Sequence, residues 1–316
     1  MCEVRADVSI IISVFNRPRL VAEAIQSALD PAASATREVI VVDDASTDET
    51  WEVVRAFEPR VRAMRLAVNR GQCNALNEGL AVAQGEYIKV LDSDDLLVAT
   101  HLDEELAMGR ATGADIVVSG WGDLAADGTR RETAAPRFDS ITDDVLAGKA
   151  VVMSAALYSR RLELRCNPEL RKLVDWDLFV SAALQAKRIA TCEGIAFWVR
   201  EHGAARVTGT ATMLAHARAH HAILRRAEER LRETGALTPA RQLRLAQYFY
   251  KGLRVLSLHD REAFEAAVRH IFELDPRFVP RDEERQGWMR AAARILGTRN
   301  ALLLHSAVKR LGVRRP

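Results

Sequence analysis

The chain has 316 residues, 48% of them hydrophobic, which is enough for a sizeable core and predicts about two domains. Its 45 basic and 43 acidic side chains leave a formal net charge of only +2, so the overall charge gives no support to nucleic acid or another polyanion as a partner. Four scattered cysteines, a first segment without a secretory pattern and the lack of an apolar stretch of membrane-spanning length predict a cytoplasmic protein with reduced thiols.

The first part of the chain alternates strands with helices. An apolar strand over residues 8–14 precedes an apolar-periodic helix that has Pro18 near its start and Leu29 near its end. Further strands are predicted at residues 38–43 and 62–68, in the segment that ends at residue 92, and at 115–119. Helices are predicted between them, at residues 48–57, 72–83 and 101–111. This winding predicts an α/β fold with a mostly parallel sheet, flanked by helices and joined by right-handed crossovers.

Beyond residue 119 the pattern weakens. Asp127-Gly128 offers a hairpin turn, and residues 151–159 predict a strand that switches direction. From about residue 210 the composition shifts towards Ala, Leu, Arg, Glu and His, which predicts three or four helices. The helix breaks are expected near 235–239, at 259–260 and across 275–280.

We therefore expect an α/β domain over residues 1–209 and an all-helical C-terminal region over residues 210–316. The last segment, 294–316, combines apolar side chains with basic ones and contains no acidic residue. Such a helix can lie on an anionic membrane surface, and the alternative is that it packs on the α/β domain and ends in a frayed basic tail.

The most informative stretch is an apolar strand that runs directly into Asp92, Asp94 and Asp95. Because alternate side chains of an extended chain face the same side, Asp92 and Asp94 are expected to face one point, with Asp95 turned towards the next helix. Oxygen-only ligands suit Mg²⁺ or Mn²⁺ better than zinc, and such ions commonly fill their open positions with water and substrate phosphates. The run predicts a divalent metal and a phosphorylated donor; the alternative is that these acids only end a strand and cap a helix.

A second acidic run, beginning with Asp43 and Asp44, follows the β-branched residues 38–42, which are typical of a buried parallel strand. Open α/β sheets bind ligands in the crevice beyond the carboxyl ends of their strands, where both acidic runs are expected to lie. Ser46 and Thr47 have a structural alternative, since either can cap the helix that follows.

These segments, together with residues 8–17, Asn69-Arg70-Gly71 and Gly85-Glu86-Tyr87-Ile88, follow the order of the motifs of family 2 glycosyltransferases, which the chain resembles strongly over residues 8–120. The resemblance is weaker to about residue 208 and absent in the helical region. It implies a GT-A fold, a nucleotide-diphosphate sugar donor, Mn²⁺ or Mg²⁺, and transfer with inversion to a hydroxyl. The implied acceptor is a glycan or a lipid-linked molecule, in bacterial-type surface polysaccharide synthesis.

The resemblance also implies roles for individual residues. Asp94 would bind the metal that bridges the diphosphate, and Asp92 would lie by the ribose. Arg70 has the alternative of being an ordinary surface cation. The residues expected to hold the nucleotide are Val14, Phe15, Asn16, Asp44, Asn69, Arg70, Asp92 and Ser93, with Arg206 on a later loop.

Inverting transfer needs a base, and the resemblance places it at Asp175 within the segment 173–179. A carboxylate there can accept the proton of the acceptor hydroxyl as its oxygen attacks the anomeric carbon. The chain departs from the family at Val174, where a Glu is usual, and at Ser181, where an Arg often falls. The alternative for Asp175 is a helix N-cap.

The segment 197–202 resembles the strand end that follows the base helix in many members of the family. By this resemblance His202 would bind the metal or the diphosphate, and Arg206 would contact phosphate. A structural histidine remains the alternative for His202.

Two other functions stay open at this point. The departures at Val174 and Ser181 leave room for a catalytically silent protein that only binds nucleotide sugar. A nucleotidyltransferase has a similar sheet and also uses carboxylate-bound metal, although no Gly-rich, basic phosphate loop follows the first strand.

Overall fold

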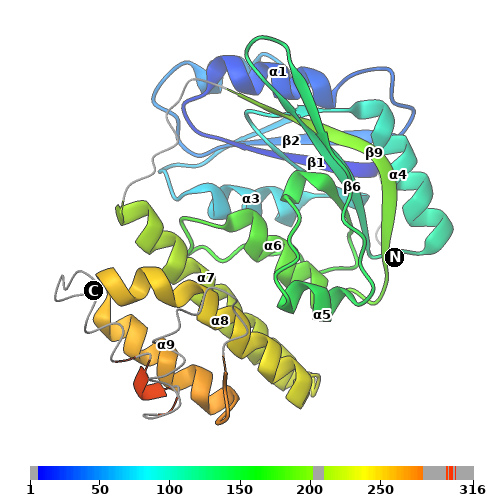
Figure 1. The fold of residues 1–316 in the computed structure, drawn as a ribbon. Helices are drawn as coiled ribbons and strands as arrows, with labels where there is room; N and C mark the ends of the chain where they lie inside the picture. The colour runs from blue at the N-terminus through cyan, green and yellow to red at the C-terminus, as the bar shows by residue number, and fades with distance from the viewer. Residues whose placement is uncertain (1–5, 202–209, 280–296, 298, 302, 304–316) are drawn as a thin grey trace. The chain divides into compact units, whose positions relative to one another are not determined.

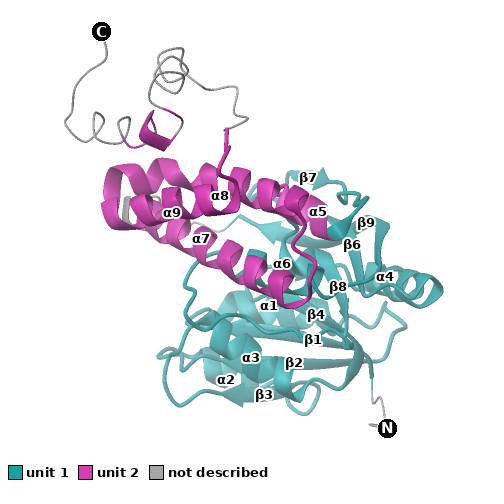
Figure 2. Ribbon diagram, turned by 90° about the horizontal axis from the view of Figure 1, so that it is seen from below, with its two compact units in different colours: residues 1–141, 150–205 teal, residues 142–149, 206–316 magenta. Residues whose placement is uncertain are grey.

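The computed structural model describes residues 6–201, 210–279, 297, 299–301 and 303. The chain divides into two compact units, shown in different colours in Figure 2. The first, here called the α/β unit, comprises residues 1–141 and 150–205; the second, the helical unit, comprises residues 142–149 and 206–316. The short segment 142–149 thus belongs to the helical unit, although the α/β unit surrounds it in sequence.

The predicted alternation of strands and helices is present in the α/β unit (Figure 1). Its strands are β1 (Ala6–Val14), β2 (Arg37–Asp43), β3 (Arg62–Arg65), β4 (Gly85–Asp92), β5 (Leu96–Leu97), β6 (Ile116–Leu124), β7 (Arg130–Thr133), β8 (Ala156–Ser159) and β9 (Ile189–Arg200). Its helices are α1 (Pro18–Ala28), α2 (Thr50–Arg55), α3 (Gln72–Val82), α4 (Ala99–Thr112), α6 (Val174–Ala183) and the 3-10 turn η1 (Met153–Ala155), while α5 (Ile141–Leu146) begins at the boundary.

The strands form one sheet in the order β3-β2-β1-β4-β8-β6-β9-β5, with β7 paired to β6. The first four strands are parallel, as predicted, and β6 is parallel to β9. The remaining pairs, β4–β8, β6–β8, β5–β9 and β6–β7, are antiparallel. Helices α1 and α3 lie on opposite faces of the sheet (Figure 1), because the crossovers run away from β1 in one direction and return past it to β4.

The elements predicted beyond residue 119, where the sequence pattern is weaker, are also present in part. A hairpin joins β6 to β7 at Asp127-Gly128, where Gly128 adopts φ +86°, a conformation that favours glycine. The strand predicted over residues 151–159 is shorter than expected, because η1 precedes β8. It does switch direction, since β8 is antiparallel to both of its neighbours. Helix α5 and the two-residue strand β5 had no counterpart in the prediction.

The helical unit contains α7 (Thr210–Glu233), α8 (Pro239–His259) and α9 (Arg261–Leu274), with breaks where the sequence predicts them. The Thr238 hydroxyl caps α8, and the Asp260 carboxylate caps α9 by accepting a backbone N–H. The helices bury an apolar stripe made of Leu245, Phe249, Leu253, Leu256, Phe264, Val268 and Ile271. Within the described ranges, none of the helices combines the length and the apolar character that crossing a membrane requires.

Candidate active site

The ends of three neighbouring strands lie level with one another. Val14 of β1 pairs with Asp43 of β2, and Ser13 of β1 pairs with Asp92 of β4. The direction of winding reverses between β1 and β4, which is the position where open α/β sheets bind ligands. The two acidic runs that the sequence singled out therefore meet at one edge of the sheet.

A pocket of about 410 Å³ lies at this edge. Six of the residues predicted for the nucleotide and the metal line it, namely Val14, Phe15, Asp44, Asp92, Ser93 and Asp94. Ser13, Arg17, Gln72 and Ala75 complete the lining. The size and the mixed polar and apolar walls suit a small ligand that carries charge.

Asp92 accepts a hydrogen bond from the Gln72 side-chain amide at 3.0 Å. Burial, followed by the charges of Asp94 and Asp175, raises the pKa of Asp92 to about 7. Burial, followed by the charges of Asp92 and Asp94, raises the pKa of Asp95 to about 8. Negative charge is thus concentrated in a small volume, which favours binding of a cation.

Asp94 forms an ion pair with Arg17, which stands just before the first turn of α1. The backbone carbonyl of Asp94 accepts a hydrogen bond from Arg200 Nε at 2.6 Å. Arg200 Nη2 also donates to the Leu20 carbonyl at 3.1 Å, and Arg200 pairs with Glu23. The end of β9 therefore holds the backbone of the acidic turn against α1.

Asp44 and Asn16 hold the loops around the pocket. The Asp44 carboxylate accepts the backbone N–H groups of Arg70 at 2.8 Å and Gly71 at 2.7 Å. The Asn16 N–H donates to Ser46 Oγ at 2.9 Å, and its side-chain oxygen accepts the Thr47 N–H at 2.8 Å. Ser46 and Thr47 therefore serve the loop and do not cap α2, whose cap position is Glu49.

The side chains of Asn69 and Arg70 are exposed and do not line the pocket. Arg70 Nη1 lies 3.7 Å from Glu78 Oε1, so its guanidinium faces a carboxylate of α3. The backbone of this segment nevertheless borders the site, because Asp44 binds it. A role for these two side chains in binding nucleotide stays a prediction.

Asp175 lies in the first turn of α6 and is half-buried. The N-cap position is held by Leu173 at φ +60°, so Asp175 is not the N-cap of this helix. Its charge is felt by Asp92 and, after burial and Cys166, helps to raise the pKa of Tyr158. Asp175 therefore lies close enough to the acidic turn for its charge to act on Asp92.

Asp177, two residues further on, has a different environment. It is buried and its carboxylate accepts the backbone N–H of Asn167 at 2.9 Å. Asp177 thus fixes the loop that leads into α6.

Two predicted residues, His202 and Arg206, lie outside the described residues. The carboxylate oxygens of Asp92 and Asp94 are of the type that Mg²⁺ and Mn²⁺ prefer, and a dication would relieve the repulsion that raises the pKa of Asp92. The described residues therefore fit the predicted ion. Sequence reasoning gave no role to Arg17, Gln72 or Arg200, although Arg17 stands in a quoted motif and Arg200 in the strand-end segment.

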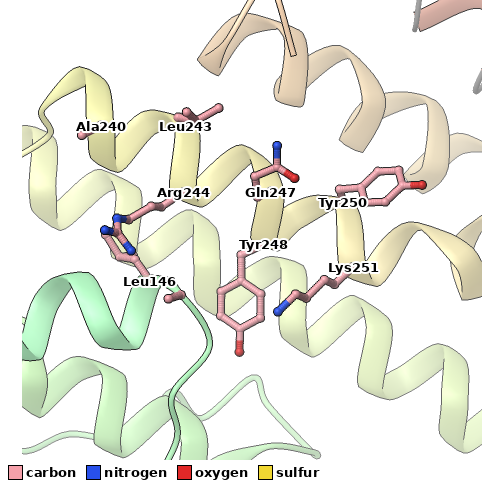
Figure 3. A pocket seen from close by; sticks show the side chains of 9 residues that line it. Leu146, Ala240, Leu243, Arg244, Gln247, Tyr248, Tyr250 and Lys251 are labelled. Carbon is pink, nitrogen blue, oxygen red and sulfur yellow. The ribbon is translucent and has the colours of Figure 1, made fainter. Parts of the chain in front are cut away.

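The helical unit has a pocket of its own, of about 480 Å³ (Figure 3). Helix α8 and residues 146–147 line it, and Tyr248 projects from α8 between Leu146 and Lys251. Lys251 Nζ lies 5.1 Å from the centre of the Tyr248 ring. Arg244 adds a second cation to the wall.

Residues 9–161 match the family described as Glycosyl transferase family 2. The chain is 31% identical over 239 residues to the succinoglycan biosynthesis protein ExoO of Rhizobium meliloti (strain 1021), a match that covers 70% of this chain and 68% of that protein. Over 119 residues it is 33% identical to the poly(ribitol-phosphate) beta-N-acetylglucosaminyltransferase TarP of Staphylococcus aureus (strain N315), covering 36% of each.

A further relative is the UDP-Glc:alpha-D-GlcNAc-diphosphoundecaprenol beta-1,3-glucosyltransferase WfaP of Escherichia coli, 34% identical over 100 residues, which are 31% of this chain and 39% of that protein. Among solved structures, S. aureus TarS 1–349 in complex with UDP-GlcNAc matches with a TM-score of 0.69 and 16% identity, covering 98% of this chain and 93% of that one. At this identity the likeness concerns the fold, and it agrees with the GT-A fold that the sequence predicts.

Proposed function

Since the chain belongs to glycosyltransferase family 2, we propose that it transfers a sugar, with inversion, from a nucleotide-diphosphate sugar to a hydroxyl of a glycan or lipid-linked acceptor. The observation that carries the proposal is the meeting of Val14, Asp44, Asp92 and Asp94 at one pocket, with the charge of Asp175 acting on Asp92. This arrangement supports the proposal of a nucleotide, a cation and a base at one site.

In the proposed reaction the acceptor oxygen forms a bond to the anomeric carbon while its proton passes to the Asp175 carboxylate. The bond from the anomeric carbon to the phosphate oxygen breaks, and its electron pair leaves on the nucleoside diphosphate. Asp175 suits the role of base because no hydrogen bond or ion pair occupies its carboxylate among the described residues.

The second part of the proposal is metal dependence. Asp94 would hold a Mn²⁺ or Mg²⁺ ion, with His202 as a further ligand, and the ion would stabilise the negative charge that grows on the departing diphosphate. Asp92 would lie by the ribose, oriented by its hydrogen bond from Gln72. Arg17 supplies a fixed positive charge beside Asp94.

Surface polysaccharide synthesis is the setting we propose, because the names of ExoO, TarP and WfaP refer to succinoglycan, poly(ribitol-phosphate) and a diphosphoundecaprenol-linked sugar. A UDP-sugar is the donor to try first, since WfaP is named for one. We expect variable segments of the chain to contact the acceptor. The pocket of the helical unit, which residues 146–147 and α8 line, is the candidate for these contacts.

We also propose that the protein works at the cytoplasmic face of the membrane, with residues 294–316 as a basic peripheral contact. That segment lies almost entirely outside the described residues. Removal of residues 294–316 should abolish binding to anionic liposomes; if the intact chain does not bind them either, this part of the proposal fails.

The test of the donor site is a thermal-shift screen of UDP, GDP, dTDP, CDP and ADP, with and without Mn²⁺. The expected result is a rise in melting temperature for one nucleotide that needs Mn²⁺ and is lost in Asp94→Ala. Asp123→Ala, which removes an exposed aspartate of β6, is the matched control. No shift with any nucleotide contradicts the proposal, and binding without transfer favours a silent nucleotide-sugar-binding protein.

A further inference from the structure

A second group of metal-ligating side chains lies away from the pocket. One ring nitrogen of His101, a carboxylate oxygen of Glu104 and the sulfur of Cys192 all lie within 4.8 Å of one another. His101 and Glu104 are three residues apart on α4 and share one face of that helix, whereas Cys192 lies on β9. His101 and Cys192 are buried, and the Glu104 side chain is 65% exposed.

A chain of buried polar contacts leads to His101. Lys89 Nζ lies 2.8 Å from both carboxylate oxygens of Glu105, and Ser119 Oγ lies 2.8 Å from Glu105 Oε1. His101 Nε2 lies 3.0 Å from Ser119 Oγ, and His101 Nδ1 lies 2.9 Å from Glu104 Oε2. Both ring nitrogens of His101 are thus held in place.

The positions of the hydrogens follow from this chain. Glu105, ionised opposite Lys89, only accepts, so the Ser119 hydroxyl donates to it. The Ser119 oxygen then accepts the Nε2–H of His101. This leaves Nδ1 facing the Glu104 carboxylate, and two lone pairs at 2.9 Å repel each other unless a cation lies between them.

That cation is either a proton on Nδ1 or a metal ion. A proton is satisfied by His101 and Glu104 alone, whereas a metal needs a further ligand, which Cys192 offers. The approach of β9 to the ring is also specific: Gly194 has φ +117°, and a Cβ there would lie 2.6 Å from Cε1 of His101. A glycine at this position keeps the strand that carries Cys192 close to the imidazole.

We propose that His101, Glu104 and Cys192 bind one Zn²⁺ ion, with water in the remaining position on the exposed side of Glu104. A nitrogen, an oxygen and a sulfur donor suit zinc, unlike the oxygen-only set at Asp92 and Asp94. Tetrahedral zinc–ligand bonds of about 2.0–2.3 Å place the donor atoms about 3.3–3.8 Å apart. The 2.9 Å contact between His101 Nδ1 and Glu104 Oε2 would therefore open by a few tenths of an ångström, which the exposed Glu104 side chain allows, and the donors that lie furthest apart would approach one another by up to about 1 Å.

The chain from Lys89 to Ser119 would orient the imidazole, as hydrogen-bond partners of metal-bound histidines commonly do. The ion would link α4 to β9, and both elements lead to the acidic turn: α4 follows it in sequence, and β9 ends at Arg200, which binds the Asp94 carbonyl. The zinc would therefore stabilise the two elements that lead to the donor site, without taking part in transfer.

The test uses the full chain without a purification tag, stripped of metal and titrated with Co²⁺ in the absence of oxygen. We expect a sulfur-to-cobalt charge-transfer band that saturates at one ion per chain, and one Zn²⁺ per chain by elemental analysis. Cys192→Ala, or Cys192→Ser if the alanine variant does not fold, should lose both. Cys166→Ala removes another buried cysteine and should keep both.

Two further measurements separate this site from the donor site. Ser119→Ala should weaken zinc binding by about 10- to 100-fold, as loss of a partner behind a ligand does. Zinc should raise the melting temperature of the wild type but not of Cys192→Ala, while the shift with nucleotide and Mn²⁺ stays in both. A wild type without zinc and without the cobalt band overturns the proposal and leaves a proton on Nδ1; a band that persists in Cys192→Ala overturns it as well.

Discussion

Arg17 and Asp94 form an ion pair at the pocket, although 77 residues separate them in the chain. The pair connects the residue that precedes α1 to the acidic turn after β4. It is partly exposed, with 38% of the Arg17 side chain and 21% of the Asp94 side chain accessible. A fixed cation therefore already lies where we propose that the metal and the diphosphate bind.

Replacing Arg17 by Ala should change the affinity for metal and the affinity for nucleotide in opposite directions. Without Arg17 the Asp94 carboxylate loses the cation that competes with a metal ion, so Mn²⁺ should bind more tightly, while the nucleoside diphosphate loses a cation and should bind less tightly. A partly exposed pair is worth up to about 1 kcal/mol, which corresponds to about fivefold for each. Calorimetric titration measures both, with Arg19→Ala, 90% exposed on α1, as the control. Equal weakening of both ligands contradicts the prediction.

Substitutions at Asp175 and Asp177 should have different effects, the first on the rate of transfer and the second on stability. Asp175→Asn should keep the melting temperature and nucleotide binding but lower the transfer rate by about 100- to 10,000-fold, the usual contribution of a general base. Asp177→Ala should instead lower stability by about 1–3 kcal/mol, because the Asn167 N–H loses its acceptor. Transfer assays and urea unfolding of both variants check this; normal transfer by Asp175→Asn would remove Asp175 from the mechanism.

The pocket of the helical unit should influence the acceptor and not the donor. Arg244→Ala with Lys251→Ala removes two cations from its wall. We expect a higher KM for the acceptor, with an unchanged KM for the nucleotide sugar. Arg269→Ala, another exposed cation of the helical unit, is the control. An unchanged acceptor KM in the double variant would exclude the pocket from acceptor binding.

The helical unit should lose stability in mild acid. Burial, then the charge of Lys251, lowers the pKa of His220 to about 4; burial, then the charges of His220, Arg225 and His270, lowers the pKa of His221 to about 3. Since both folded values lie below about 6.5 in the unfolded chain, the unfolded state binds protons first. Their stabilisation is complete above about pH 6.5 and declines as the pH falls towards 4, by at most about 1.4 kcal/mol per pH unit for each proton.

Urea unfolding between about pH 7 and about pH 5 measures this dependence, before most carboxylates titrate. His221→Phe should reduce the slope without leaving a polar partner unsatisfied, because Nε2 of His221 has no hydrogen-bond partner in the described part of the chain. Its ring packs 5.3 Å from Phe249, so an aromatic replacement keeps that contact. His216→Phe, at an exposed position of the same helix, is the control, and an equal change of slope in that variant would contradict the prediction.

The strands and helix breaks that depend on local sequence pattern were predicted correctly. β-Branched runs that end in acids predicted β2 and β4, and a parallel register then brings Asp44 and Asp92 to one edge of the sheet. The breaks between α7, α8 and α9 followed from proline, glycine and capping residues. The family resemblance added the roles, and the fold class and the family are confirmed.

Contacts between distant side chains were not predictable from the sequence. Gln72 binds Asp92, and Asp44 binds the backbone of Arg70 and Gly71, only because the folded chain brings α3 and its preceding loop to the strand ends. The grouping of His101 with Cys192 also depends on packing of α4 against β9, since the cysteines show no metal-ligand spacing in sequence.

The assignment of residues 142–149 to the helical unit limits how the protein can be cut or recombined. Val145 and Leu146 are buried, and Asp143 pairs with Arg241 of α8 at 3.0 Å. A truncation after residue 209 would thus leave an apolar segment in the middle of the remaining chain without its partners. Exchanging the C-terminal helices between relatives should therefore succeed only when residues 142–149 are exchanged together with them.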